Sequence, residues 1–294
     1  MWRRVAWLLA LASLLVSCGQ PGSQDGPRLV ATTTMVADMV RQIAGHRLRV
    51  QGLLTPGADP HIYRPVPRDA EAIAQAPLVF SHGLHLEPWL PDLVRQSGGK
   101  GRQVVVAEGL ANRRSPTDAS LPDPHIWFDV PRWRRTIPRV VQALSAHDPA
   151  GRQVFEANAR LYDQQLGLLD AWIRRELAQV PRARRRLVTS HDAFGYFGAA
   201  YGFEVVPIQG VSTESEAGTQ DLVRVVQRVK QAQVPMVFVE TSVNARLVEQ
   251  VARETGARVG GPLYSDACGA FDTSGGSYVG MLRDNVAVIV EGLQ

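Results

Sequence analysis

The sequence predicts an α/β protein in which two parallel-sheet lobes are joined by one long linking helix. Short strand-like apolar runs alternate with helical segments in both halves of the chain, which is typical of parallel sheets. Between residues 149 and 180 the pattern changes, because apolar residues recur at helical spacing and no proline follows the first. At 294 residues the chain is long for one core and fits two lobes.

Residues 1–17 are predicted to be a lipoprotein signal peptide. Arg3 and Arg4 precede an apolar run from Val5 to Val16, and this run is shorter than the roughly 20 residues that span a bilayer. The tetrad that ends at Cys18 (LVSC) resembles the bacterial lipobox, in which the cysteine is acylated. Cys18 is therefore the expected lipidation site, with a retained membrane helix or cleavage without acylation as alternatives.

Residues 18–27 are interpreted as a flexible tether, since Gly, Gln, Ser and Pro dominate and no apolar periodicity is present. We therefore expect an exported protein, anchored by lipid to the outer face of the cytoplasmic membrane. After acylation of Cys18, Cys268 is the one thiol left, so no intramolecular disulfide is possible.

The first lobe is expected at residues 28–148. A helical pattern of apolar residues runs from Met35 to Ile43, and a loop rich in Gly and Pro occupies 55–67. Short helices alternate with the later strands. The predicted strands are 29–31, 48–54, 78–80 and 104–106.

Residues 149–180 are expected to form the linking helix. Pro149 suits its first turn, and a helix of some thirty residues with a rise of 1.5 Å per residue has a length on the order of 40 Å. The apolar residues that define the helix are Phe155, Leu161, Leu166, Leu169, Trp172, Ile173 and Leu177.

The second lobe is expected at residues 181–294, where the alternation of strands and helices resumes. We find no internal repeat strong enough to use. The predicted strands are 187–189, 205–208, 236–239 and 257–259, and the predicted helices are 222–229 and 247–254.

Charge and composition argue against a nucleic-acid partner. Hydrophobic residues make up 45% and charged residues 20% of the chain, as in globular proteins. Removing Arg3 and Arg4 with the signal lowers the formal charge from +4 to +2, which is a small excess. The densest basic cluster, at 182–186, has no interleaved aromatic residues and is expected to be a solvated connection.

Three histidines, His61, His125 and His191, lie in polar segments beside strand-like runs. In open parallel sheets ligands bind beyond the carboxyl ends of the strands, which is where His61 and His191 fall. His61 and His125 each follow an Asp-Pro pair, so Asp59 and Asp123 are available to orient the imidazole rings. These positions are candidates for a metal site.

Asp266 lies in a loop of small residues after 257–259 and could supply a fourth ligand. Composition and spacing leave other interpretations open. A lone histidine is more often a surface or hydrogen-bonded residue, and Asp59, Asp123 and Asp192 could be helix caps. The candidates also lack the close pairing of a zinc finger.

A series of segments resembles the solute-binding proteins of zinc and manganese ABC transporters, in order and across nearly the whole mature chain. The segments are 31–45 (ATTTMVADMVRQIAG), 57–69 (GADPHIYRPVPRD), 81–89 (SHGLHLEPW), 123–130 (DPHIWFDV), 190–196 (SHDAFGY), 211–222 (VSTESEAGTQDL), 238–244 (FVETSVN) and 264–269 (YSDACG).

The resemblance implies four metal ligands, two from each lobe, at His61, His125, His191 and Asp266. It also implies a cleft site for Zn²⁺ or Mn²⁺ as the transported ligand, a rigid linking helix, and a membrane permease with its ATPase as partners. Zinc is expected first, because three imidazoles and one carboxylate suit four-coordinate zinc better than manganese. We expect a monomer.

Some residues depart from the family pattern or stay ambiguous. Many zinc-specific members carry a long loop rich in histidine and acidic residues in the first lobe. The corresponding segment here, residues 109–122, is short and contains no histidine, which weakens any idea that a flexible loop scavenges metal. Cys268 is expected to be a small buried residue rather than a sulfur ligand. Glu240 is expected to accept a hydrogen bond near the site rather than to bind metal.

Other histidines are expected to lie outside the site. His82 and His85 would form a surface metal pair if they were helical, but Gly83 between them favours a loop wall. His46 and His147 are expected at the surface.

An exported zinc hydrolase is the main rival, with Glu240 as its general base. The sequence has no HExxH, GxSxG or Walker motif. Ser190, His191 and Asp192 are consecutive, so they cannot all face one another as a nucleophilic triad does. We therefore expect no enzyme. A surface adhesin role would be additional to metal capture.

Overall fold

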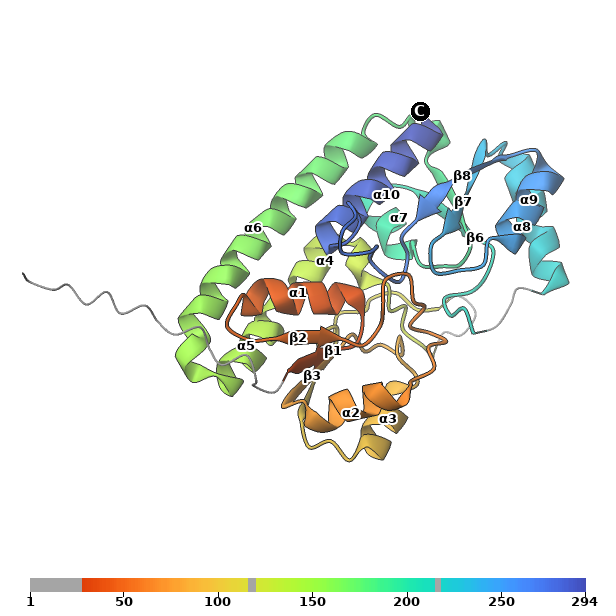
Figure 1. The fold of residues 1–294 in the computed structure, drawn as a ribbon. Helices are drawn as coiled ribbons and strands as arrows, with labels where there is room; N and C mark the ends of the chain where they lie inside the picture. The colour runs from red at the N-terminus through yellow and green to blue at the C-terminus, as the bar shows by residue number, and fades with distance from the viewer. Residues whose placement is uncertain (1–27, 116–119, 215–217) are drawn as a thin grey trace, which may run out of the picture.

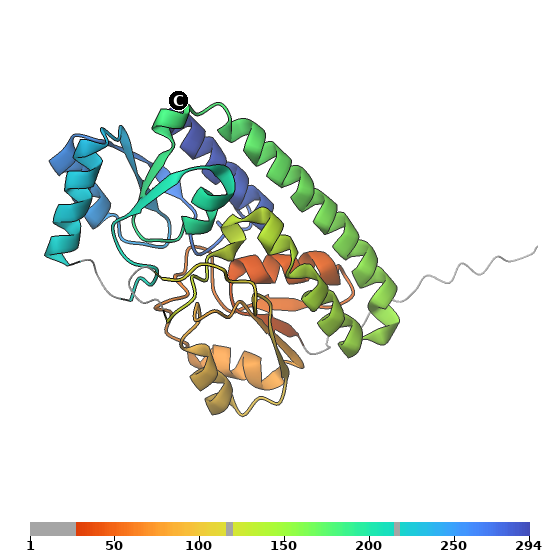
Figure 2. The same cartoon turned by 180° about the vertical axis from the view of Figure 1, so that it is seen from behind.

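The computed structural model describes residues 28–115, 120–214 and 218–294. The expected signal peptide, the acylation site Cys18 and the tether lie outside these residues. Within them, no helix is both long and apolar enough to cross a membrane. Two α/β lobes lie side by side, and one long helix runs along both (Figures 1 and 2).

The first lobe contains a parallel sheet in the order β2-β1-β3-β4. Its strands are β1 (Leu29–Ala31), β2 (Val50–Gly52), β3 (Leu78–Ser81) and β4 (Arg102–Val105). Strand β2 is shorter than the expected 48–54, because Leu53 and Leu54 leave the strand and pack into a core cluster with helix residues on one face of the sheet.

Helices cover both faces of this sheet (Figure 1). Side chains alternate across a strand, so Leu29 packs with α1 while Val30 packs with α2 and α3. Thr33 caps α1 by accepting the Val36 N–H at 3.3 Å. The helices of this lobe are α1 (Thr34–Ala44), α2 (Pro67–Gln75), α3 (Leu90–Ser97), α4 (Val130–Arg134) and α5 (Ile137–His147).

The second lobe repeats the strand order of the first. β5 (Arg186–Thr189) pairs in parallel with β6 (Glu204–Pro207), and β7 (Met236–Glu240) pairs in parallel with β8 (Arg258–Leu263). β5 lies beside β7, so the spatial order is β6-β5-β7-β8. The helices of this lobe are α7 (Gly195–Tyr201), α8 (Thr219–Gln231), α9 (Arg246–Thr255) and α10 (Tyr278–Leu293).

The linking helix α6 (Arg152–Leu177) follows a 3-10 turn at Pro149–Gly151, so the α-helical geometry begins three residues after the expected start. Its 26 residues span about 39 Å. Leu161 belongs to the apolar series but is 66% exposed. The residues that α6 buries are Phe155, Ala159, Tyr162, Leu166, Leu169, Ile173 and Leu177.

One hydrophobic core runs through both lobes beside α6. Phe128 of the first lobe stacks on Phe194 of the second, with ring centroids 4.4 Å apart. Trp127 donates its indole N–H to the Ser265 carbonyl at 3.0 Å. Because close-packed cores resist deformation, these contacts and α6 limit the motion of one lobe against the other.

Candidate metal centre

The four candidate ligands meet between the two lobes. His191 follows β5 by two residues and Asp266 follows β8 by three, while His61 lies in the loop after β2 and His125 precedes a 3-10 turn at Ile126–Phe128. Their ligand atoms all lie within 4.8 Å of one another. His125, His191 and Asp266 are fully buried, and His61 is 4% exposed.

The spacing of the donor atoms matches a small divalent ion. A tetrahedral site with bonds of about 2.0–2.1 Å places its donors about 3.3–3.4 Å apart. The observed separations are 3.4 Å for His61 Nε2 to His125 Nε2, 3.3 Å for His125 Nε2 to His191 Nε2, 3.4 Å for His125 Nε2 to Asp266 Oδ1, 3.4 Å for His191 Nε2 to Asp266 Oδ2 and 3.9 Å for His61 Nε2 to Asp266 Oδ1.

The two oxygens of Asp266 have different surroundings. Oδ2 accepts hydrogen bonds from the Ser242 hydroxyl at 2.9 Å and the Ser265 hydroxyl at 3.1 Å. Oδ1 is buried and accepts no well-formed hydrogen bond from the described residues, and the nitrogen recorded nearest to it is His125 Nε2 at 3.4 Å. A buried carboxylate oxygen without a close donor is costly, so a cation beside Oδ1 would lower that cost. Neither serine was among the predicted site residues, although Ser242 lies in the 238–244 segment and Ser265 in the 264–269 segment.

Carboxylates orient two of the three imidazoles. The Nδ1–H of His125 donates to Asp123 Oδ1 at 2.8 Å. The Nδ1–H of His191 donates to Glu240 Oε2 at 2.5 Å, and Glu240 Oε1 accepts the His191 backbone N–H at 3.0 Å. Both rings therefore point an Nε2 lone pair at the centre. Glu240 is the hydrogen-bond acceptor that the sequence predicted.

Asp59 does not repeat the role of Asp123, although both precede a Pro-His pair. Its Oδ1 accepts the backbone N–H of His61 at 2.8 Å, and its Oδ2 accepts the hydroxyl of Thr213 at 2.6 Å. The carboxylate thus fixes the backbone of the loop and reaches the second lobe. Thr213 was not predicted to bind Asp59.

Burial and charge shift the pKa values in opposite directions across the site. Burial lowers the pKa of His61 to about 3. Burial also disfavours charge on His125, but hydrogen bonds to Asp123 and Asp266 raise its pKa to about 9. For His191 the carboxylates of Glu240 and Asp266 overcome burial and raise the pKa well above its usual value. Without metal, His125 and His191 therefore also carry a proton on Nε2 at neutral pH, which an incoming metal ion must displace.

Asp266 is ionised in spite of its burial. Burial alone would raise its pKa, but the charge of His191 and hydrogen bonding with His125 and His191 hold the pKa well below its usual value. A buried anion facing three imidazole nitrogens favours a cation at the centre.

His82 and His85 do not form a metal pair. His82 is fully buried, contacts the Trp127 ring at 5.0 Å between centroids, and donates its Nε2–H to the Pro124 carbonyl at 2.7 Å. Burial lowers its pKa to about 3. His85 is exposed with a φ of 63°, so the segment is a loop, as expected.

The remaining ambiguous residues lie outside the centre. Cys268 is buried, and its backbone N–H donates to the Thr34 hydroxyl at 2.7 Å. It is absent from the group of donor atoms that meet at the centre, and burial raises the pKa of its thiol to about 12. His46 and His147 are exposed.

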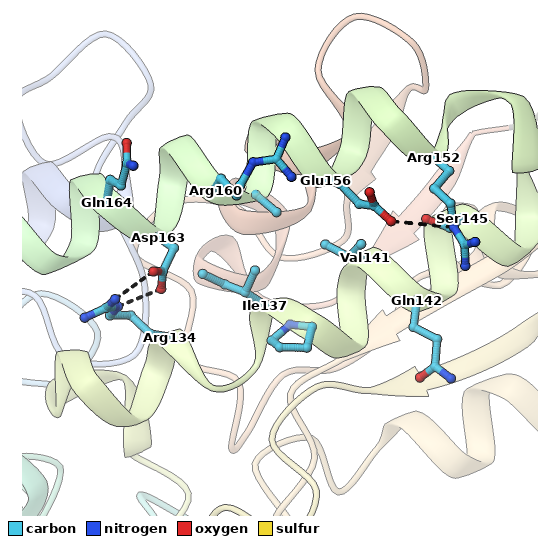
Figure 3. A pocket seen from close by; sticks show the side chains of 12 residues that line it. Arg134, Ile137, Val141, Gln142, Ser145, Arg152, Glu156, Arg160, Asp163 and Gln164 are labelled. Carbon is cyan, nitrogen blue, oxygen red and sulfur yellow. Dashed lines mark hydrogen bonds and ion pairs between the residues drawn. The ribbon is translucent and has the colours of Figure 1, made fainter.

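A separate groove of about 680 Å³ lies between α5 and α6 (Figure 3). Ile137, Val141 and Ala159 line it, and the Arg134–Asp163 ion pair spans it. It includes none of the four candidate ligands.

The fold and the buried group of three histidines and one aspartate define a metal-binding protein with two α/β lobes. Residues 29–292 match the family described as zinc-uptake complex component A, periplasmic. The chain belongs to this family. The family assignment makes the protein an extracytoplasmic binding component of a metal-uptake complex, and it confirms the expectation that the protein is not an enzyme.

Individual relatives agree over nearly the full length. The chain is 39% identical to the zinc-binding protein TroA of Treponema pallidum, covering 99% of this chain and 98% of that one. It is 37% identical to the manganese-binding lipoprotein MntA of Bacillus subtilis, with the same coverage of 99% and 98%. The solved structure of periplasmic TroA from Treponema pallidum superposes with a TM-score of 0.86 at 38% identity, covering 91% of this chain and 99% of that chain.

Proposed function

We propose that the protein captures zinc outside the cytoplasmic membrane and delivers it to the permease of an ABC importer. The ligands are the Nε2 atoms of His61, His125 and His191 together with Oδ1 of Asp266. The observation that carries the proposal is the meeting of these four buried donors at separations that suit one ion.

The donor set favours zinc over manganese. The two relatives above are named for different metals, one for zinc and one for manganese, so similarity does not decide between them. Three nitrogen donors suit four-coordinate zinc, whereas manganese prefers oxygen ligands and a larger shell, and the affinity order for divalent ions also favours zinc. The hydrogen bonds on Asp266 Oδ2 support binding through Oδ1 alone, which keeps the coordination number low.

The proposed division of the chain follows the ligands. The first lobe, residues 28–148, supplies His61 and His125, and the second lobe, residues 181–294, supplies His191 and Asp266. Residues 149–180 link them. An ion bound by all four side chains would therefore join the two lobes.

We further propose that the protein is a monomer held at the membrane by acylated Cys18. The lipobox and the polar tether support the anchor, and the Bacillus subtilis relative is named a lipoprotein. The partners would be the permease, with its ATPase on the cytoplasmic side.

Metal analysis of the soluble domain, purified without chelator, tests the proposal. We expect about one zinc ion per chain, and competitive titration should show tighter binding of zinc than of manganese. Manganese that displaces zinc at equal concentration would contradict the zinc assignment. Absence of any bound divalent metal, even after incubation with zinc, would contradict metal capture itself.

A further inference from the structure

His125 is held through Asp123, and Asp123 is itself held by Arg113. One carboxylate oxygen of Asp123 accepts the ring N–H and the backbone N–H of His125. The other accepts the Nε–H of Arg113 at 3.3 Å. The Asp123 backbone N–H donates to the Arg113 carbonyl at 3.1 Å. Arg113 therefore fixes Asp123 through both its side chain and its backbone.

Tyr196 reaches this segment from the other lobe. It lies on α7 and is 1% exposed. Its hydroxyl accepts the backbone N–H groups of Asn112 and Arg113 at 3.1 and 3.3 Å, and it donates to the Asp123 carbonyl at 3.4 Å. A phenol offers one donor and two acceptor sites, so all the hydrogen-bonding sites of this hydroxyl are filled by backbone groups of the first lobe.

The second lobe is also shaped to receive Arg113. The guanidinium lies over the Tyr196 ring, 5.7 Å from its centroid. A Cβ atom on Gly195 would come within 2.6 Å of Arg113 Nη2, so a side chain there would push the guanidinium away. Arg113 is thus packed by the second lobe while it binds the carboxylate that orients His125.

We propose that Arg113 and Tyr196 are positioning residues that hold Asp123, and through it the imidazole of His125, while the second lobe is seated on the first. Neither residue touches the metal. When the second lobe moves away from the first, the Tyr196 hydroxyl no longer binds the Arg113 and Asp123 backbone, and Asp123 holds the His125 ring less firmly. Metal retention therefore depends on contact between the two lobes at Tyr196. This inference rests on the proposed ligand set.

Two matched pairs of variants test it. Tyr196→Phe is compared with Tyr201→Phe, because Tyr201 lies on the same helix and its hydroxyl donates to Asp170 at 2.9 Å. Arg113→Met is compared with Arg134→Met, because Arg134 pairs with Asp163 in the groove of Figure 3 and the two arginine side chains are 37% and 35% exposed.

Zinc affinity is measured by chelator competition, zinc release by stopped flow, and ligand geometry by the visible absorption of the Co²⁺ form. Loss of partners around a metal ligand costs about 10- to 100-fold in affinity, and we expect about tenfold weaker binding and faster release in Tyr196→Phe and Arg113→Met. Their Co²⁺ spectra should change, and Arg113→Lys should recover part of the affinity. Tyr201→Phe and Arg134→Met should match the wild type within twofold.

Equal affinities and unchanged Co²⁺ spectra across both pairs would overturn the inference, as would equal losses in the test and control variants. Failure of the wild-type protein to bind zinc would instead overturn the proposed function. The two failures are distinguishable because the second is visible before any variant is made.

Discussion

Replacing His191 with alanine should remove most of the stabilisation of the fold by zinc. The imidazole is fully buried, and its Nε2 lies 3.3 Å from His125 Nε2 and 3.4 Å from Asp266 Oδ2. Zinc held by ligands from both lobes binds the folded chain only. Free zinc at a hundredfold excess over its dissociation constant therefore stabilises the wild type by about 2.7 kcal/mol.

The size of the effect on the melting temperature follows from the length of the chain. For a domain of this size, 1 kcal/mol moves Tm by about 2 °C, so zinc should raise the wild-type Tm by about 5 °C. If the loss of His191 raises the dissociation constant a hundredfold, the same zinc concentration stabilises the variant by about 0.4 kcal/mol. Its Tm should then rise by less than about 1 °C.

Differential scanning fluorimetry of metal-stripped protein in buffered zinc measures these shifts. His147→Ala is the matched control, because His147 is an exposed histidine at the end of α5 and its loss should leave the shift of about 5 °C intact. Equal zinc-induced shifts in wild type and His191→Ala would show that zinc acts elsewhere and would refute the assigned site.

Further outcomes can be measured on the same protein. Glu240→Gln should weaken zinc binding about 10- to 100-fold in competition titrations, since the carboxylate orients His191; unchanged affinity would remove that role. Zinc displaces protons from His125, whose pKa is about 9, and from His191, whose pKa is raised, so affinity should rise with pH through 7 to 9; a flat profile would contradict ligation by these rings. This pH range lies above 6.5, the pKa of an unperturbed histidine. His82, whose pKa is about 3, takes up its proton on unfolding, so this residue alone should cost the metal-free protein up to about 1.4 kcal/mol of stability for each pH unit that the pH falls below 6.5. His82→Gln should make the unfolding free energy, measured by urea titration, depend less steeply on pH. An identical dependence in the variant would disprove its assignment to His82. Cys18→Ala should move the protein from the membrane to the soluble fraction, and retention at the membrane would count against the acyl anchor.

Local sequence patterns predicted the strands and the long linking helix, but they did not predict α7 or α10. The apolar spacing around Phe155 and Leu166 predicts a long helix, and strand-like runs at 29–31 and 187–189 predict strands that the structure contains. The same patterns could not reveal that the strands lie in the same spatial order in both lobes. The strand order depends on pairing between distant segments, and a single strand does not encode its neighbour.

The candidate ligands show the same difference between what local sequence predicts and what only the folded chain reveals. The Asp-Pro-His pattern and the family resemblance indicated His61 and His125, but the two patterns behave differently in the folded protein. Asp123 binds the ring of His125, whereas Asp59 turns to Thr213 of the second lobe. The two Asp-Pro-His segments diverge because Asp59 meets the Thr213 hydroxyl of the second lobe, whereas Asp123 is bound by Arg113 of its own lobe and by Tyr196 of the second.

The sequence by itself therefore determined the alternation of strands and helices, the linking helix, and the four residues of metal-binding type with their family. Only the tertiary structure decided that the ligand atoms of these four residues lie within 4.8 Å of one another, that Ser242 and Ser265 donate to Asp266 Oδ2, and that Glu240 orients His191. The physical reason is that secondary structure follows from contacts a few residues apart. The centre forms from segments far apart in the chain, and packing of the two lobes brings them together.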